Sequence, residues 1–153
     1  MIVEPAIIHL MGKKLIGNST RMSLINNKTG ELWRSFIQQK TSIPNSIGTD
    51  LYSVQLYPDY YFEQFNLALD FEKWAAVEVT NFDHIPNRMA TFELAAGLYA
   101  VFTYKGLSND NRIFEYIFNH WLPAAEWLLD NRPHFEILGE KYKNNDPDSE
   151  EEI

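Results

Sequence analysis

The sequence predicts an α+β fold made of two similar modules, and three observations support this class. The chain has 153 residues with 45% hydrophobic and 14% aromatic content, which suits one globular domain or two small fused modules. Each half places strand-like sequence before a helix and a strand after it. Both helices carry paired apolar positions at a repeat spacing of roughly 80 residues, which is longer than solenoid periods. We therefore expect duplicated strand-helix-strand-strand modules with pseudo-twofold symmetry, whose antiparallel sheets form a central cleft backed by the two helices.

The first half contains one clear helix between strands. Two short apolar runs around residues 12–14 predict a strand or hairpin. The segment "NNKTGELWRSFIQQK" has apolar residues at helical spacing, with Asn and Thr as cap candidates. "DLYSVQLYP" alternates, with Tyr52, Val54 and Leu56 on one strand face. The aromatic segment 59–70 has no clear period, so a loop, a short helix and a lid all stay open.

The second half repeats this order. "FEKWAAVEVTNF", "MATFEL" and "LYAVFTYKG" predict three strands. "SNDNRIFEYIFNHWLP" predicts the second helix, with Ser108 as its cap and Pro123 close to its end. "HFEILGEKY" predicts a late strand, and "NNDPDSEEEI" a solubilising acidic tail whose start can pair with a sheet edge.

Composition excludes several classes of function. With 13 Lys and Arg against 21 Asp and Glu, the net charge of −8 repels a phosphate backbone, so we expect no direct nucleic-acid binding. The chain has no cysteine, so disulfides and thiolate chemistry are excluded. Glu4 and Pro5 interrupt the apolar N-terminus, and no run reaches the length of a membrane span. We expect a cytoplasmic protein without a membrane partner.

The usual catalytic and cofactor motifs are missing from the sequence. The histidines His9, His84, His120 and His134 share no metal-ligand spacing. There is no GxSxG elbow and no glycine-rich phosphate loop. We therefore expect neither a metal nor a cofactor.

The stretch "RPHFEILGEKY" raises one question about a carboxylate. Strand alternation places Glu136 with His134 and Leu138 on one face, away from Phe135 and Ile137. A solvated carboxylate on a polar face is the simplest interpretation, since Glu is seldom buried. If the helices cover the side of Phe135 and Ile137, Glu136 instead points into the groove between the modules.

Three stretches carry a resemblance to a known family: "LYAVFTYKG", "FNHWLP" and above all "RPHFEILGEKYKNNDPDSEEEI". They look like the GyrI-like small-molecule-binding domain, the effector-binding half of many AraC-type and some MerR-type bacterial transcription regulators. The resemblance implies one such domain over residues 1–153, with approximate halves 1–82 and 88–153, standing alone without a DNA-binding domain. The family usually closes with a short aromatic-Ile-Pro-Ile strand, whereas this chain ends at Ile153, so an edge strand is expected to be absent or different.

The same resemblance implies a binding site. By motif position Glu136 matches the family glutamate that reads cationic or polar lipophilic effectors, and Tyr99 matches the family tyrosine. Tyr52, Trp74 and Trp121 fall at positions similar to cleft aromatics, although from sequence alone each is an ordinary core candidate. A carboxylate ringed by aromatics loses hydration, which suits pairing with a cation or acting as a general base.

Three functions stay open at this point. The first is binding of a lipophilic or cationic effector, for regulation or for sequestration of a drug or toxin, with Glu136 as the anchor. The second is hydrolysis of strained cyclopropanoid compounds, in which Glu136 activates water and Tyr99 positions or protonates the substrate. The third is a protein interaction of the gyrase-inhibitor kind, with a protein partner or a second copy of the chain.

Overall fold

The computed structural model describes residues 3–108 and 110–153, so Met1 and Ile2 of the apolar N-terminus and Asn109 of the predicted second helix segment lie outside the described residues. The described elements are β1 (Ala6–Leu10), β2 (Lys13–Met22), α1 (Thr29–Gln39), η1 (Lys40–Ser42), β3 (Leu51–Leu56), β4 (Phe71–Val79), β5 (Ala90–Leu94), β6 (Gly97–Val101), β7 (Thr103–Lys105), α2 (Arg112–Tyr116), η2 (Ile117–Trp121, a π-helical turn), α3 (Leu122–Ala124), β8 (His134–Leu138) and β9 (Glu150–Glu152). The predicted α+β class is confirmed. Within the described ranges, no helix is long and apolar enough to cross a membrane.

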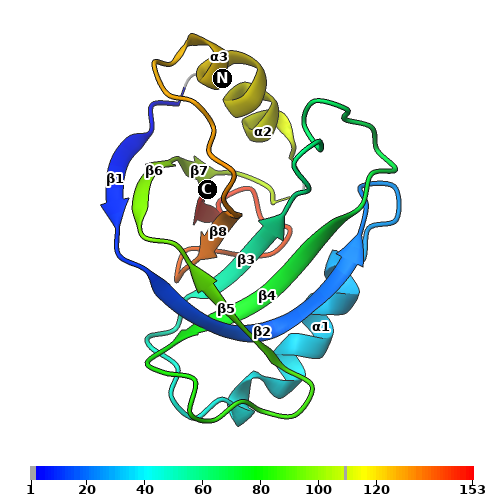
Figure 1. Ribbon diagram of the computed structural model, residues 1–153, viewed down its shortest axis with the longest axis vertical. Helices are drawn as coiled ribbons and strands as arrows, with labels where there is room; N and C mark the ends of the chain where they lie inside the picture. The colour runs from blue at the N-terminus through cyan, green and yellow to red at the C-terminus, as the bar shows by residue number, and fades with distance from the viewer. Residues whose placement is uncertain (1–2, 109) are drawn as a thin grey trace.

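The sheets show the predicted duplication. The larger sheet has the order β5-β2-β4-β3-β8-β9-β7, and β1 pairs with β6 in a separate ribbon (Figure 1). In the first module β4 lies between β2 and β3, and in the second β9 lies between β7 and β8. Because β3 and β8 pair antiparallel at the centre, the strand order on one side of that seam mirrors the order on the other.

The first strand of each half crosses to the other half. β1 pairs with β6 of the second half, from Ala6 opposite Val101 to Leu10 opposite Gly97. β5 in turn pairs with β2 of the first half, from Lys13 opposite Leu94 to Gly17 opposite Ala90. Each half therefore supplies a pairing strand to the other, β1 to the separate ribbon with β6 and β5 to the edge of the larger sheet.

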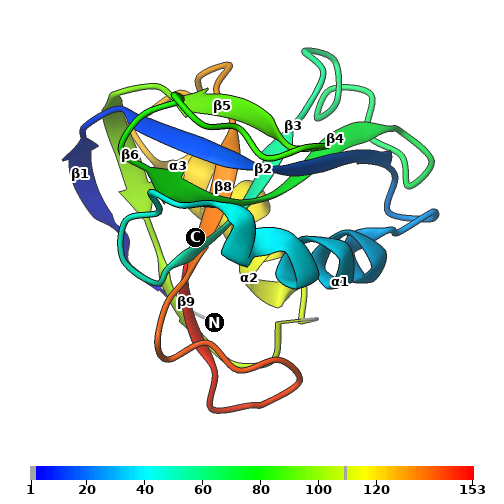
Figure 2. The same ribbon diagram turned by 90° about the horizontal axis from the view of Figure 1, so that it is seen from below.

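The helices cover one face of the larger sheet (Figure 2). α1 buries Leu32 and Phe36 against Ile16, Ala75 and Val77. On the opposite face Tyr52, Val54 and Trp74 pack with Leu15. The alternation predicted for the two central strands is thus confirmed, with the odd-numbered residues of β4 on the helix side.

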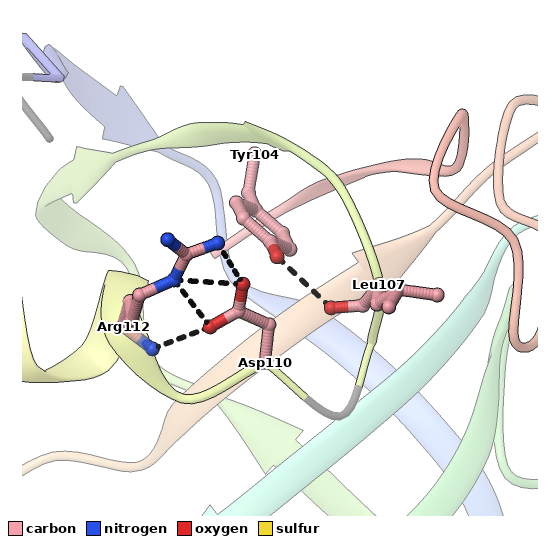
Figure 3. A network of polar contacts seen from close by, with 4 residues as sticks. All are labelled: Tyr104, Leu107, Asp110 and Arg112. Carbon is pink, nitrogen blue, oxygen red and sulfur yellow. Dashed lines mark hydrogen bonds and ion pairs between the residues drawn. The ribbon is translucent and has the colours of Figure 1, made fainter.

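The second helix begins later than the sequence indicated. The N-cap residue is Asn111, and not the predicted Ser108, and its side chain makes no capping hydrogen bond. Asp110, just before the cap, accepts a hydrogen bond at its Oδ1 from the backbone N–H of Arg112 at 3.0 Å. The Arg112 guanidinium also donates to the Asp110 carboxylate at 2.6 Å (Figure 3), and these hydrogen bonds lower the pKa of Asp110. The Tyr104 hydroxyl donates to the Leu107 carbonyl at 2.9 Å in the same turn.

Two predicted segments differ from the structure. The single strand expected over "LYAVFTYKG" divides at Phe102 into β6 and β7, because β6 pairs with β1 and β7 pairs with β9. The acidic terminus is no tail: Glu150–Glu152 forms β9 between β8 and β7. β9 holds the place in the second half that β4 holds in the first. The edge strand expected to be absent or different is therefore present in this chain as a run of glutamates. Segment 59–70, for which the sequence left a loop, a short helix and a lid open, consists of turns and irregular loop.

Candidate ligand-binding site

A cavity of about 420 Å³ lies beside β8 in the second half of the molecule. The β1–β6 ribbon forms one wall, with Ile8, Leu98 and Tyr99. The second wall comes from α2 and the turns after it, with Phe118 and Trp121, and the third from the loop 127–133. The floor is β8, together with Gln55 of β3 and Tyr57, the residue that follows β3.

The cavity opens where the sheet is incomplete. β8 pairs with β3 along its whole length, whereas within the described residues its pairing with the short β9 is limited to Ile137 opposite Glu152. The edge of residues 134–136 therefore faces the cavity and not another strand. Side chains from both faces of β8 reach the lining for this reason, and these are His134, Phe135, Glu136 and Ile137.

Glu136 is a buried carboxylate in the cavity floor, with 9% of its surface exposed. The Gln55 side-chain Nε2 donates hydrogen bonds to its two oxygens at 2.9 and 3.3 Å. The interpretation of Glu136 as a solvated surface group is therefore wrong. The conditional expectation for the helices is also corrected. Glu136 lies opposite Ser53, and Ser53 lies opposite Ala75, which packs against α1, so Glu136 is on the helix side while Phe135 and Ile137 pack with the opposite cluster.

Tyr99 presents its ring at one wall of the cavity. The ring lies edge to face with Phe135 at 5.5 Å, and the Arg132 guanidinium lies 4.5 Å from the ring centre. The Tyr99 hydroxyl donates to the Ala95 carbonyl at 2.8 Å. The hydroxyl is therefore engaged with backbone, and the aromatic face is the part of Tyr99 at the site.

A stack of rings joins segment 59–70 to one wall of the cavity. Phe62, from the turns of that segment, stacks on Phe118 at 5.0 Å and on His134 at 5.5 Å. Phe118 and His134 are themselves nearly parallel at 5.7 Å. Burial lowers the pKa of His134 to about 4, so this imidazole is a neutral aromatic wall at neutral pH. Segment 59–70 thus supports the cavity wall from behind, because Phe62 packs on the lining residues Phe118 and His134 without lining the cavity itself.

The remaining predicted site residues divide between the cavity and the core. Trp121 lines the cavity and lies edge to face with Phe102 at 5.2 Å. Tyr52 and Trp74 are 3% and 6% exposed and pack in the cluster on the sheet face away from the helices. The structure brings Glu136, Tyr99 and Trp121 together at the cavity, and it places Tyr52 and Trp74 outside its lining.

Two further charged residues lie behind Glu136 on the same sheet face. Lys73 of β4 is 8% exposed and lies directly opposite Gln55 of the neighbouring strand β3. Burial lowers the pKa of Lys73, while Glu136 and Glu151 oppose that change. Burial and then Glu136 raise the pKa of Glu151 to about 7, and Lys73 partly offsets this. Burial, then the charge of Glu136, also raises the pKa of Tyr57.

Sequence reasoning missed the polar partners of Glu136. The alternation of "DLYSVQLYP" placed Gln55 on the correct face. The register that sets Ser53 opposite Glu136 and Gln55 opposite His134 joins two strands far apart in the chain, so local sequence does not reveal it. Lys73 carried the one available signal, since a lysine inside an apolar strand calls for a partner. Over residues 3–108 and 110–153 no cluster of three or more His, Cys, Asp or Glu side chains is arranged to hold a metal ion.

Comparison with solved structures shows the fold. The integron cassette protein of Vibrio cholerae has a TM-score of 0.64 at 13% identity, with 97% of this chain and 93% of that chain covered. The structure of SAV2435 bound to tetraphenylphosphonium has a TM-score of 0.67 at 17% identity, with 98% and 91% covered. The EcmrR C-terminal domain has a TM-score of 0.70 at 15% identity, with 100% and 96% covered.

Comparison of the sequence with family models shows the family. A search of curated protein sequences gave no match to this chain. The model of the integron-associated effector binding proteins, Cass2, matches residues 2–153. This match spans both modules, the cavity beside β8 and the closing strand. The chain belongs to the integron-associated effector binding proteins, a family of small-molecule-binding domains related to the ligand-binding domains of transcription regulators.

Proposed function

We propose that this protein binds a lipophilic cation in the cavity beside β8, with Glu136 as the electrostatic anchor and Tyr99 and Trp121 as aromatic walls. One observation carries the proposal: a buried carboxylate lies in the floor of a largely apolar cavity, and within the described residues its hydrogen bonds come from Gln55.

The physical argument concerns the solvation of that carboxylate. A buried charge costs free energy unless it is paired and hydrogen-bonded, and an amide such as Gln55 supplies hydrogen bonds without a formal charge. A cation beside Glu136 gains a charge interaction in a region of reduced dielectric. Aromatic faces add cation–π attraction of about 0.5–2 kcal/mol each. A large hydrophobic cation satisfies both the carboxylate and the apolar walls.

The comparisons are consistent with this chemistry. Tetraphenylphosphonium, the compound named with the SAV2435 structure, combines four phenyl rings with one delocalised positive charge. EcmrR has been solved in complex with DNA, and the region of EcmrR similar to this chain covers 55% of it. We infer a role in ligand sensing related to transcription regulation, or in sequestration of the ligand, without direct contact between this acidic chain and DNA.

Fluorescence titration with tetraphenylphosphonium tests the proposal, because Trp121 and Trp127 both line the cavity. We expect a saturable change in tryptophan emission for the wild type. The Glu136→Gln variant keeps the shape and loses the charge, so its affinity should fall at least tenfold. Glu140→Gln, a change at an exposed carboxylate after the same strand, is the matched control and should bind as the wild type does. Equal affinity in Glu136→Gln and wild type would contradict the anchor role.

Hydrolysis by Glu136 is the alternative that this site must be tested against. The Tyr99 hydroxyl is held by the Ala95 carbonyl at 2.8 Å, so the arrangement favours a wall over a proton donor. We therefore expect no turnover of a strained cyclopropanoid electrophile by the wild-type protein. Turnover that disappears in Glu136→Gln would instead assign the site to an enzyme.

A further inference from the structure

The buried lysine behind Glu136 is the least expected charge in the molecule. Lys73 belongs to β4, in the middle of the larger sheet, and only 8% of it is exposed. Lysine is almost never buried to this degree unless it is paired. Its directly paired residue on β3 is Gln55, whose side chain binds Glu136. Directly paired residues point to the same face of a sheet, so Lys73 and Glu136 share the helix-side face.

Glu151 approaches the same point from the other side of β8. The register of β8 and β9 sets Ile137 opposite Glu152, so the residues just before each, Glu136 and Glu151, share the other face. Glu151 also pairs with Tyr104 of β7. Lys73, Glu136 and Glu151 therefore form a diagonal row of three ionisable groups on one sheet face, two acidic and one basic. Lys73 and Glu136 are buried, and Glu151 is half-buried.

The histidine and the two tyrosines around this row do not carry charge at neutral pH. His134 on β8 has its pKa lowered to about 4 by burial. Tyr57 after β3 and Tyr104 on β7 have their pKa values raised, in each case first by burial. Among the described residues on this sheet face, the charge beneath the cavity floor is therefore set by Lys73, Glu136 and Glu151. Asp130, Arg132 and Glu152 also line the cavity, but the first two belong to the loop 127–133 and Glu152 lies on the opposite face of the sheet, with Ile137.

We propose that Lys73 and Glu151 determine the charge that a ligand meets at Glu136, so that uptake of a monocation releases a proton from this pair while uptake of a neutral ligand of similar shape does not. This inference rests on the proposed function and deepens it. A proton leaves either the Lys73 ammonium or the Glu151 carboxyl for solvent, and the bound cation replaces the lost positive charge. The sum of charges beneath the cavity is thereby conserved.

The physical reason is the low dielectric around the row. A cation beside Glu136 repels the protonated Lys73 and favours the ionised form of Glu151, so both effects act toward proton release. Burial lowers the pKa of Lys73, which already weakens its hold on a proton. Burial also raises the pKa of Glu151 to about 7, so that this carboxyl holds a proton it can release near neutral pH. A neutral ligand brings no charge and leaves the proton in place.

Isothermal titration calorimetry at pH 7 in phosphate and in Tris, whose ionisation enthalpies differ, counts the released protons. For tetraphenylphosphonium we expect release of about half to one proton, and an affinity that rises by up to tenfold per pH unit between pH 6 and 8 because one proton is linked to binding. For neutral triphenylphosphine oxide we expect no buffer dependence. Equal proton release with both probes, or none with either, would overturn the inference.

Two variants assign the proton. Glu151→Gln should abolish most of the release and flatten the pH profile, while Lys73→Met should tighten tetraphenylphosphonium binding severalfold by removing the competing charge. Glu150→Gln alters an adjacent carboxylate that contacts Lys141 at 3.8 Å, and it should keep the wild-type proton count. An unchanged count in Glu151→Gln together with unchanged affinity in Lys73→Met would contradict the assignment.

Failure of this inference differs from failure of the proposed function. Saturable tetraphenylphosphonium binding that depends on Glu136 but shows no linked proton leaves the function standing and overturns the role of Lys73 and Glu151. Absence of any saturable binding overturns both.

Discussion

Arg132 supplies a positive charge in the lining of the cavity in which we propose that a cationic ligand binds. Its guanidinium lies 4.5 Å from the centre of the Tyr99 ring and donates to the Leu98 carbonyl at 2.7 Å. It also pairs with Asp130 at 2.8 Å. The chain itself therefore occupies an aromatic face that a ligand cation would otherwise use.

Replacement of Arg132 tests this competition. We expect Arg132→Met, which keeps the length of the side chain, to raise the affinity for tetraphenylphosphonium about fivefold, since one cation–π contact amounts to about 1 kcal/mol. Titration at low and high salt measures the effect and its screening. Arg112→Met, a change at an exposed arginine outside the cavity lining, is the control. Weaker binding in Arg132→Met would show that Arg132 instead maintains the cavity wall.

His134 links the stability of the protein to pH. Its pKa is about 4 in the fold against 6.5 when unfolded, so the unfolded chain binds more protons between these values. Stability from this group is present above pH 6.5 and is lost as the pH falls toward 4. At pH 4.5 the loss is about 2 kcal/mol.

His134→Phe removes that titration while it keeps an aromatic ring against Phe62 and Phe118. Urea unfolding at pH 7 and pH 4.5 measures the effect. The stability difference between the two pH values should be about 2 kcal/mol smaller in the variant. His84→Gln, in an exposed turn, should leave the difference unchanged. A pH dependence identical to that of the wild type in His134→Phe would show that carboxylates alone cause the acid loss.

At the level of single residues, the sequence predicted the position of Glu136 better than its environment. Family resemblance indicated Glu136, Tyr99 and Trp121, and all three line the cavity. Gln55, Lys73 and Glu151 stayed unseen because they come within reach of Glu136 through pairing between strands far apart in the chain. Alternation gives the face of a side chain, whereas register decides its neighbours.

Among the secondary-structure elements, β2 and β4 approach each other so closely at Gly17 that no side chain fits there. A Cβ added at Gly17 would overlap the Ala75 carbonyl oxygen and lie 2.7 Å from the Ala76 Cβ. These atoms belong to the centre of the sheet and cannot move independently. Glycine is therefore required at this position of β2.

Gly17→Ala should accordingly destabilise the protein by about 3 kcal/mol, as overpacking of a rigid core does. Gly30→Ala is the matched control, because its nearest neighbour is the flexible Arg34 side chain at 3.4 Å, and alanine in α1 should add about 0.5 kcal/mol. Denaturant unfolding of both variants gives the comparison. A loss below about 1 kcal/mol in Gly17→Ala would contradict the predicted clash.

The elements also show where composition misleads. The run Glu150–Glu152 has the charge of a solvated tail, yet it forms β9 between two strands. Backbone pairing compensates for the low strand propensity of glutamate, because Ile153 and Phe102 exchange two hydrogen bonds at 2.8 Å. Local propensity is a weak guide for strands whose partners are distant, so this error could not be avoided from local sequence.

At the scale of the whole molecule, the exchange of β1 and β5 makes the two halves interdependent. The fragment 1–82 would lack β5, the partner of β2, and the fragment 88–153 would lack β1, the partner of β6, so both would expose unpaired strand edges. We propose that the chain is a single folding unit. Calorimetry of the whole protein should show one transition with equal calorimetric and van't Hoff enthalpies.

The separate fragments provide the second measurement. Each fragment alone should show little ordered secondary structure by circular dichroism, and an equimolar mixture should regain part of the native signal. Two independent transitions in the whole protein, or a stably folded 1–82 fragment, would contradict a single unit.

The short β9 also has a consequence for redesign of the protein. The opening beside β8 is placed by strand length and main-chain pairing, and the aromatic and charged groups around it are side chains. The backbone that shapes the cavity and the side chains that line it are thus separate features. Ligand specificity can therefore be changed by substitutions at positions such as Glu136 or Trp121 while the backbone keeps its shape. The domain is therefore suited as a scaffold for biosensors, in which one backbone carries different sets of cavity side chains.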